Sequence, residues 1–152
     1  MSLQGKLISE INIKCNGDVF HEIIKYKPHD IFSICSDKIQ NMDIHEGELG
    51  NIGSVKSWKF TYGGKEIFVK EVIEEIDDEK KLIKKKVIEG DLLEYYESFY
   101  ATIQVETKGE NNLVTWIMEY EKMNVNVPDP HYLMEFCLGA TKDIGLTISS
   151  DT

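Results

Sequence analysis

Apolar and polar residues alternate along most of the central part of the chain, and this two-residue period predicts a series of β-strands. Short turns rich in glycine, aspartate and asparagine separate the alternating segments, and connections this short join antiparallel neighbours. The pattern predicts strands at residues 6–15, 39–46, 54–62, 66–76, 81–89, 97–107 and 113–122, with turns at 63–64, 77–78, 90–91 and 109–112. In the second strand, Met42 and Ile44 are the expected inner residues. These seven strands are expected to form one antiparallel sheet.

A helical period replaces the alternation on both sides of this central series. Between the first two strands, Asp18 is typical of the cap of one short helix, and Pro28 is typical of the start of a second. Residues 130–147 form an amphipathic helix whose apolar face carries Tyr132, Leu133, Phe136, Cys137, Ala140 and Ile144. The predicted fold class is α+β: a curved antiparallel sheet with two short helices and a long C-terminal helix. At 152 residues, the chain is expected to form a single domain over residues 1–152.

The expected inner faces of the strands carry bulky aromatic side chains. A curved sheet that buries one face under a single helix tends to enclose a space, and ligand cavities are mostly apolar. The pattern therefore indicates a binding protein for a hydrophobic small molecule rather than an enzyme, and we assign no catalytic residue. The candidate ligand-binding residues are Trp58, Phe60, Phe68, Phe99, Ile103, Trp116, Met118, Tyr120, Tyr132, Phe136 and Ala140.

The charge of the chain argues against nucleic acid as a partner. The formal net charge is −10 at pH 7, which repels phosphates. All 17 basic residues are lysine, so the chain has no guanidinium group for bidentate contacts to phosphate or to guanine. The lysines at 80–81 and 84–86 are interpreted as the solvated surface of a hairpin, with Lys85 as the one candidate for an inward position.

The N-terminal residues lack the basic and apolar regions of a secretory signal, and no run approaches the ~20 apolar residues that span a bilayer. The three cysteines, Cys15, Cys35 and Cys137, are odd in number and widely spaced, which favours reduced thiols. We therefore expect a cytoplasmic protein without stable membrane insertion.

The motifs that would hold a cofactor or a metal are missing from the sequence. Gly47, Gly50 and Gly53 recur every third residue, but no Lys-Ser/Thr pair follows them and the segment joins two predicted strands, unlike a phosphate-binding loop. The four histidines share no helical or strand spacing typical of zinc ligands. We predict neither a cofactor nor a metal, and interpret residues 47–53 as a flexible connection.

Three polar residues, Lys85, Tyr120 and Asp43, are candidates for acid–base chemistry, because each faces the interior in one strand phase. A lysine among apolar walls has a lowered pKa and can act as a base or form an imine. The structural interpretation is favoured, in which Lys85 reaches water at the rim and Tyr120 makes a hydrogen bond in the core. An enzymatic role stays an alternative.

Gly139 and Gly145 lie inside the predicted C-terminal helix, where each costs about 1 kcal/mol of helix stability relative to alanine. One interpretation is close packing of the helix on the sheet. The other is a lid that moves to admit a ligand.

Five segments, in the same order along the chain, resemble the major latex proteins of the birch-pollen-allergen (Bet v I-type) superfamily. These are LQGKL at 3–7, GDVFHE at 17–22, HEGELGNIGSV at 45–55, VIEGD at 87–91 and YEK at 120–122. The resemblance extends over essentially the whole chain. It implies a helix-grip fold with a hydrophobic cavity between the sheet and the terminal helix.

The resemblance also implies a role in plant defence or stress responses through binding of lipophilic molecules. Proteins of the superfamily bind lipids, steroids, cytokinins or flavonoids, and a few catalyse alkaloid condensations or rearrangements. Hormone receptors share the broader fold, so a sensor that recruits a protein partner through the loop at 47–53 is a further alternative. We match no complete set of catalytic residues of the enzymatic members onto this chain. The net charge and the missing arginines argue against the ribonuclease activity reported in the superfamily.

Overall fold

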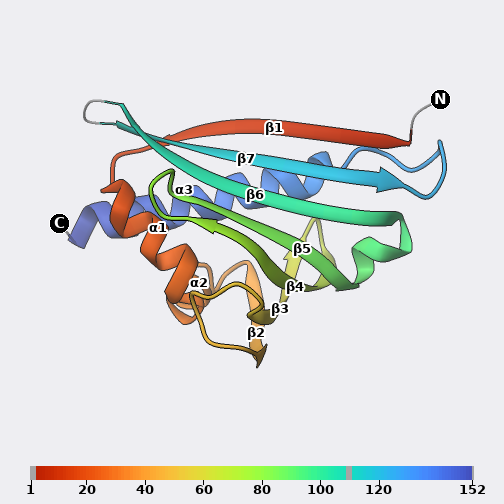
Figure 1. Cartoon of the computed structure of the whole chain (residues 1–152), viewed down its shortest axis with the longest axis horizontal. Coiled ribbons are helices and arrows are strands. Elements are labelled where there is room, and N and C mark those ends of the chain that lie inside the picture. Colours follow the sequence, from red (N-terminus) through yellow and green to blue (C-terminus); the bar gives the residue numbers. More distant parts are fainter. Residues whose placement is uncertain (1–2, 109–110, 152) are drawn as a thin grey trace.

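The computed structural model describes residues 3–108 and 111–151. Within them, a seven-stranded antiparallel sheet curves around a long helix, with the strand order β1-β7-β6-β5-β4-β3-β2 (Figure 1). The strands are β1 (Gln4–Ile13), β2 (Ile39–Glu46), β3 (Val55–Tyr62), β4 (Lys65–Asp77), β5 (Leu82–Gly90), β6 (Tyr96–Lys108) and β7 (Asn111–Lys122). The helices are α1 (Gly17–Tyr26), α2 (Pro28–Ile34), a 3-10 turn η1 (Asp91–Glu94) and α3 (His131–Asp151). The predicted fold class is confirmed.

The element boundaries differ slightly from the predicted ones. Strand β1 begins and ends two residues earlier than the alternation indicated, and η1 extends the connection predicted as a turn at 90–91. The backbone N–H of Phe68 donates to Asp91 Oδ2 at 2.8 Å, which ties η1 to β4. Gly109 and Glu110 of the turn predicted at 109–112 lie outside the described residues.

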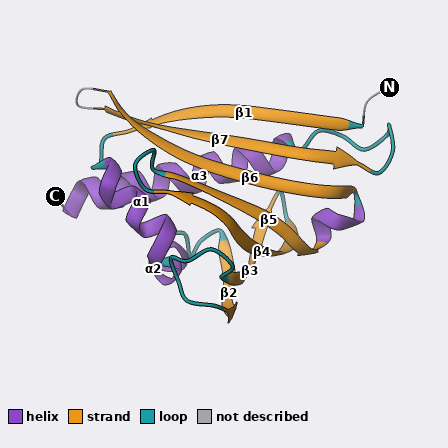
Figure 2. Ribbon diagram, viewed as in Figure 1, coloured by secondary structure: helices purple, strands orange, loops and turns teal. Residues whose placement is uncertain are grey.

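Helix α3 runs along the inner side of the sheet, behind β6 and β7 in Figure 2, and α1 and α2 stand at the end of the sheet near the C-terminus of α3. Trp116 Nε1 on β7 donates to Thr141 Oγ1 on α3 at 2.9 Å. The rings of Phe60 on β3 and Phe136 on α3 stack with their centroids 4.3 Å apart. Buried contacts on both halves of the sheet thus hold α3 against it.

The first helix is capped by a residue other than the predicted one. The side-chain oxygen of Asn16 accepts hydrogen bonds from the backbone N–H groups of Asp18 at 2.8 Å and Val19 at 3.3 Å. The prediction of Asp18 as the cap was therefore wrong by two positions, and Asp18 lies in the first turn instead. The prediction for Pro28 is confirmed, because it stands in the first turn of α2.

The predicted inner face of β2 was correct for Met42 and wrong for Ile44. Met42 is buried, whereas Ile44 is 40% exposed. The pairing with β3 shifts register between Ile39 and Asn41, which inserts an extra residue and lets both Ile39 and Met42 face inward. A second shift follows between Ile44 and Glu46, so simple alternation fails along this edge strand.

Candidate functional site

A cavity of about 130 Å³ lies between the sheet and α3, and its wall is predominantly apolar. Strands β3, β4, β5, β6 and β7 supply one side, and α3 supplies the other. Of the predicted ligand-binding residues, the wall includes Trp58, Phe60, Phe99, Ile103, Trp116, Met118, Phe136 and Ala140. Their contact with a ligand stays a prediction, but the structure brings them together around one space.

Three predicted residues, all in the described part of the chain, contribute nothing to this wall: Phe68, Tyr120 and Tyr132. The inward position expected for Phe68 was wrong. Its neighbours Ile67 and Val69 are buried, so Phe68 points to the opposite face of β4. Residues 67, 68 and 69 are all apolar, so alternation alone did not show which of them point to the inner face of β4.

Tyr120 is buried, but it belongs to a polar contact at the start of α3. Its hydroxyl donates to Asp129 Oδ1 at 2.5 Å, and Lys122 Nζ lies 3.1 Å from the same oxygen. Burial, followed by this hydrogen bond, raises the pKa of Tyr120. The expectation that Tyr120 makes a hydrogen bond in the core is thus confirmed. Tyr132 is half-buried, with its ring centroid 6.5 Å from that of Tyr62.

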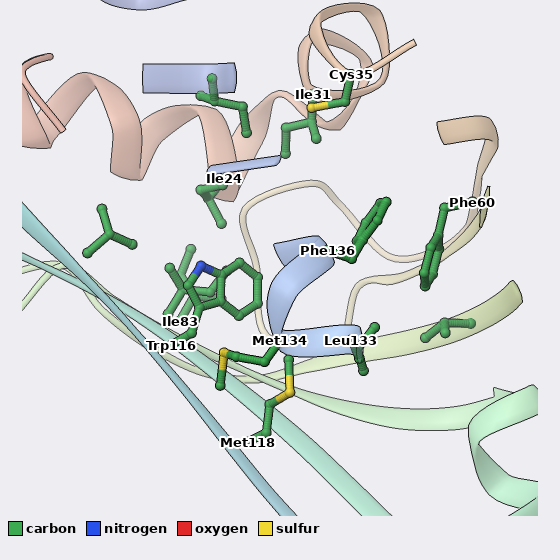
Figure 3. Close-up of a cluster of buried hydrophobic side chains, with 14 of the residues drawn as sticks. Ile24, Ile31, Cys35, Phe60, Ile83, Trp116, Met118, Leu133, Met134 and Phe136 are labelled. Atoms are coloured by element: carbon green, nitrogen blue, oxygen red, sulfur yellow. The ribbon is translucent and has the colours of Figure 1, made fainter. Parts of the chain in front are cut away.

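The two short helices, β2 and η1 also contribute to the cavity wall, and the sequence analysis did not predict these contributions. Ile24 of α1, Ile31 of α2 and Ile39 of β2 line the space. Figure 3 shows Ile24 and Ile31 in the same cluster of buried side chains as Trp116 and Phe136. The apolar faces of these helices were visible in the sequence. Their position against the same cavity depended on how the helices pack.

A buried ion pair also lies in the wall, and the sequence analysis found only one of its members. Lys85 Nζ lies 3.5 Å from Glu71 Oε2, with the two side chains 10% and 9% exposed. Trp58 Nε1 donates to Glu71 Oε1 at 2.5 Å. The expectation that Lys85 reaches water at the rim was wrong, because Glu71 holds its ammonium group inside. Glu71 was missed because a charged residue on a strand is usually exposed.

A second buried lysine lies next to this pair. Lys56 is 2% exposed and lies directly opposite Glu71 in the β3–β4 ladder, on the face that also carries Trp58. Burial lowers the pKa of Lys56 to about 8, against the attraction of Glu71, and the charge of Lys85 lowers it further. We call Lys56, Glu71 and Lys85 the buried charge cluster.

The remaining candidates for chemistry lie elsewhere or are inert. Asp43 is exposed and pairs with Ser57 on the outer face of β3, so it does not share a site with Lys85 or Tyr120. The thiol of Cys137 lines the cavity, and burial raises its pKa to about 12, which keeps it protonated at neutral pH. All three cysteines are free.

The glycines at 47, 50 and 53 serve the backbone of the β2–β3 loop. Their φ angles are 76°, 84° and 92°, a conformation that other residues rarely adopt. A Cβ atom on Gly50 would also lie 2.0 Å from the ring of Tyr26 at the end of α1. These geometric needs explain the spacing.

In the described residues, no helix is long and apolar enough to cross a membrane, and no group of three or more histidine, cysteine or acidic residues could hold a metal ion.

The curved antiparallel sheet that grips a long helix, with an apolar cavity between them, defines a helix-grip protein. The chain belongs to the pathogenesis-related protein Bet v 1 family, whose model matches residues 2–151. It is 41% identical to MLP-like protein 43 of Arabidopsis thaliana, over 94% of this chain and 92% of that protein. It is 34% identical to Major latex protein 149 of Papaver somniferum, over 93% and 89%. The similarity to major latex proteins expected from the sequence is confirmed.

The relatives differ in length and in their similarity to this chain. MLP-like protein 28 of Arabidopsis thaliana is also 41% identical, but the chain spans only 43% of that protein. The crystal structure of ginseng major latex-like protein 151 from Panax ginseng matches with a TM-score of 0.92 and 45% identity, over 95% of this chain and 97% of that one. Norcoclaurine synthase from Thalictrum flavum, in complex with dopamine and hydroxybenzaldehyde, matches with a TM-score of 0.76 and 16% identity, over 96% and 88%. At that identity, it shares the fold alone.

Proposed function

We propose that this protein binds a hydrophobic small molecule, such as a lipid, a steroid or a plant secondary metabolite, in the cavity between the sheet and α3. The binding would serve storage, transport or signalling in plant defence or stress responses, in the cytoplasm. The observation that carries the proposal is the space of about 130 Å³ with a predominantly apolar wall. Removing apolar surface from water is favourable, so this wall would stabilise a bound hydrophobic molecule that displaces water from it.

A thermal-shift panel of fatty acids, lysolipids, sterols and flavonoids tests this proposal. A ligand at a hundred times its dissociation constant stabilises the folded state by about 2.7 kcal/mol, so at least one class should raise the melting temperature. The variant Ala140→Phe fills part of the cavity and should reduce the shift. Lys142→Phe, on the exposed side of the same helix, is the matched control and should leave the shift unchanged. A panel that moves no melting temperature would contradict the proposal.

An enzymatic role is the second candidate, and the position of Lys85 in the cavity wall beside Glu71 favours it. In this alternative, Lys85 acts as an acid–base group on an alkaloid precursor. Lys85→Met should then abolish product formation while the precursor still binds. Equal rates in the variant and the parent would exclude this role for Lys85.

A further inference from the structure

The buried charge cluster has more hydrogen-bond donors than acceptors. Both oxygens of Glu71 already have partners, Trp58 Nε1 on one and Lys85 Nζ on the other. An ammonium group carries three donors, and Lys85 forms an ion pair with one oxygen of Glu71. Among the described residues, Glu71 is also the carboxylate whose charge offsets that of Lys56, its direct neighbour on β3. One carboxylate thus serves two ammonium groups.

The same cluster also has an excess of positive charge. It holds two ammonium groups and one carboxylate, and all three side chains are at least nine-tenths buried. The neighbouring polar groups of the wall, Cys137 and Thr141, are neutral at pH 7. A buried charge without a partner is costly, so a bound anion would stabilise this part of the wall.

We propose that the cavity selects an apolar molecule that ends in a single carboxylate, with this carboxylate bound by Lys85 and its charge balanced by Lys56. This inference rests on the proposed function, since it names the chemical class of the ligand. Lys85 lines the cavity and supplies the direct contact, whereas Lys56, opposite Glu71 on β3, is not a lining residue and contributes through its charge. The apolar part of the ligand would lie against the side chains of Trp116, Met118 and Phe136.

Ligands with a terminal alcohol or amine fit this wall less well than a carboxylate. A neutral alcohol supplies an acceptor but leaves the positive charge uncompensated. A terminal amine would place a third ammonium beside the two lysines, and the oxygens of Glu71 are already occupied. The cluster therefore predicts the order carboxylate, alcohol, amine for ligands that share one apolar body.

The experiment compares octanoic acid, octan-1-ol and octylamine by isothermal titration calorimetry at pH 7. The three ligands share one apolar chain and differ only in the terminal group, so differences in affinity report on that group. We expect octanoate to bind the parent protein at least about tenfold more tightly than octanol, with octylamine weakest. This comparison needs no variant and does not depend on whether a variant folds.

Variants of the cluster then show which residues cause the preference for octanoate. Lys85→Met should weaken octanoate binding by about tenfold or more and leave octanol unchanged. Glu71→Gln should tighten octanoate and weaken octylamine, because one negative charge is removed. The double variant Lys85→Met/Glu71→Gln avoids an unpaired buried carboxylate. It should bind octanoate more weakly than the parent, because the direct contact is lost while the charge of Lys56 stays, and it should bind octanol as the parent does. Lys86→Met, an exposed lysine on the same strand, is the matched control and should behave as the parent.

The outcomes separate this inference from the proposed function. Octanol binding as tight as octanoate binding, or tighter binding of octylamine, would overturn the carboxylate preference while the cavity remained a ligand site. Equal octanoate affinity in Lys85→Met and the parent would overturn the role of the cluster. If none of the three ligands binds, and the wider panel also moves no melting temperature, the proposed function fails as well.

Discussion

At the scale of single residues, Lys56 has the most unfavourable surroundings of the charged side chains in the cavity region. It is 2% exposed, and its neighbouring charges are one carboxylate, Glu71, and one further ammonium, Lys85. Burial disfavours the charged form of a lysine, and one shared carboxylate compensates two ammonium groups incompletely. Such a residue lowers the stability of the unliganded protein. Residues of this kind are found where a ligand or another function needs the charge.

Lys56→Met should therefore stabilise the unliganded protein at pH 7. Burial lowers the pKa of Lys56 from 10.5 to about 8, which corresponds to a free-energy gain on the order of 3 kcal/mol when the charge is removed. Between these pKa values the unfolded parent binds more protons than the folded parent, so this lysine makes parent stability rise with pH. The advantage of the variant should be full below pH 8 and vanish by about pH 10.5. Urea unfolding at several pH values measures it.

The control for this prediction is Lys59→Met, a more exposed lysine on the outer face of the same strand. Its partner is Glu66 at 3.3 Å, an exposed ion pair that contributes little to stability. The free energy of unfolding should hardly change in this variant at any pH. A Lys56→Met protein that is no more stable than the parent at pH 7 would show that the charge of Lys56 is compensated in the folded state.

At the scale of elements, the start of α1 shows how a local pattern can indicate the right helix and the wrong cap. Asn16 and Asp18 are both residues that favour a cap position. The backbone of Asn16 is extended, with φ of −61° and ψ of 130°, and its side chain accepts two backbone N–H groups. Asp18 lies in the first turn, where its negative charge interacts favourably with the helix dipole. Its carboxylate also forms an ion pair with Lys81 at 3.3 Å.

Asn16→Ala should destabilise the protein by about 1 kcal/mol, because it leaves backbone N–H groups at the start of α1 without their acceptor. Asp18→Ala should cost less, since the lost ion pair and dipole interaction are exposed to solvent. Thermal or urea unfolding of both variants measures the difference. A larger loss in Asp18→Ala would contradict the assignment of the cap to Asn16.

At the scale of the whole molecule, the two glycines of α3 have different surroundings, so the two interpretations do not apply equally to both. A Cβ atom on Gly145 would lie 2.8 Å from Ile13 Cγ2, so at this position the helix packs closely on β1. A Cβ atom on Gly139 would meet only Lys38 Nζ, at 3.5 Å. Close packing therefore explains Gly145, while Gly139 has room for a methyl group.

Gly139→Ala should stabilise the protein by up to about 1 kcal/mol, because alanine favours the helix and fits the space. Gly145→Ala should destabilise it, since Ile13 or the helix must shift. If flexibility at Gly139 lets α3 move, Gly139→Ala should also slow the uptake of a fluorescent lipid in stopped-flow experiments. An unchanged uptake rate in a clearly stabilised variant would show that the rigidity of α3 does not control entry.

Much of the fold followed from short-range information in the sequence. Alternation identified the strands because each side chain on a strand points to the opposite face from its neighbour, and short turns required antiparallel pairing. The apolar face at Leu133, Phe136 and Ile144 identified α3 for the equivalent helical reason. These features depend on a few consecutive residues, so the sequence by itself determined them.

The tertiary structure decided which residues share the cavity and how its charged groups are balanced. Alternation was ambiguous where adjacent residues are all apolar, as at Phe68, and failed where a register shift inserts a residue, as before Met42. Glu71 could be placed inside only once β5 and β3 brought Lys85 and Trp58 to its two oxygens. A buried charge is stable only with partners from other strands, and those partners are set by register and curvature, which no local pattern contains.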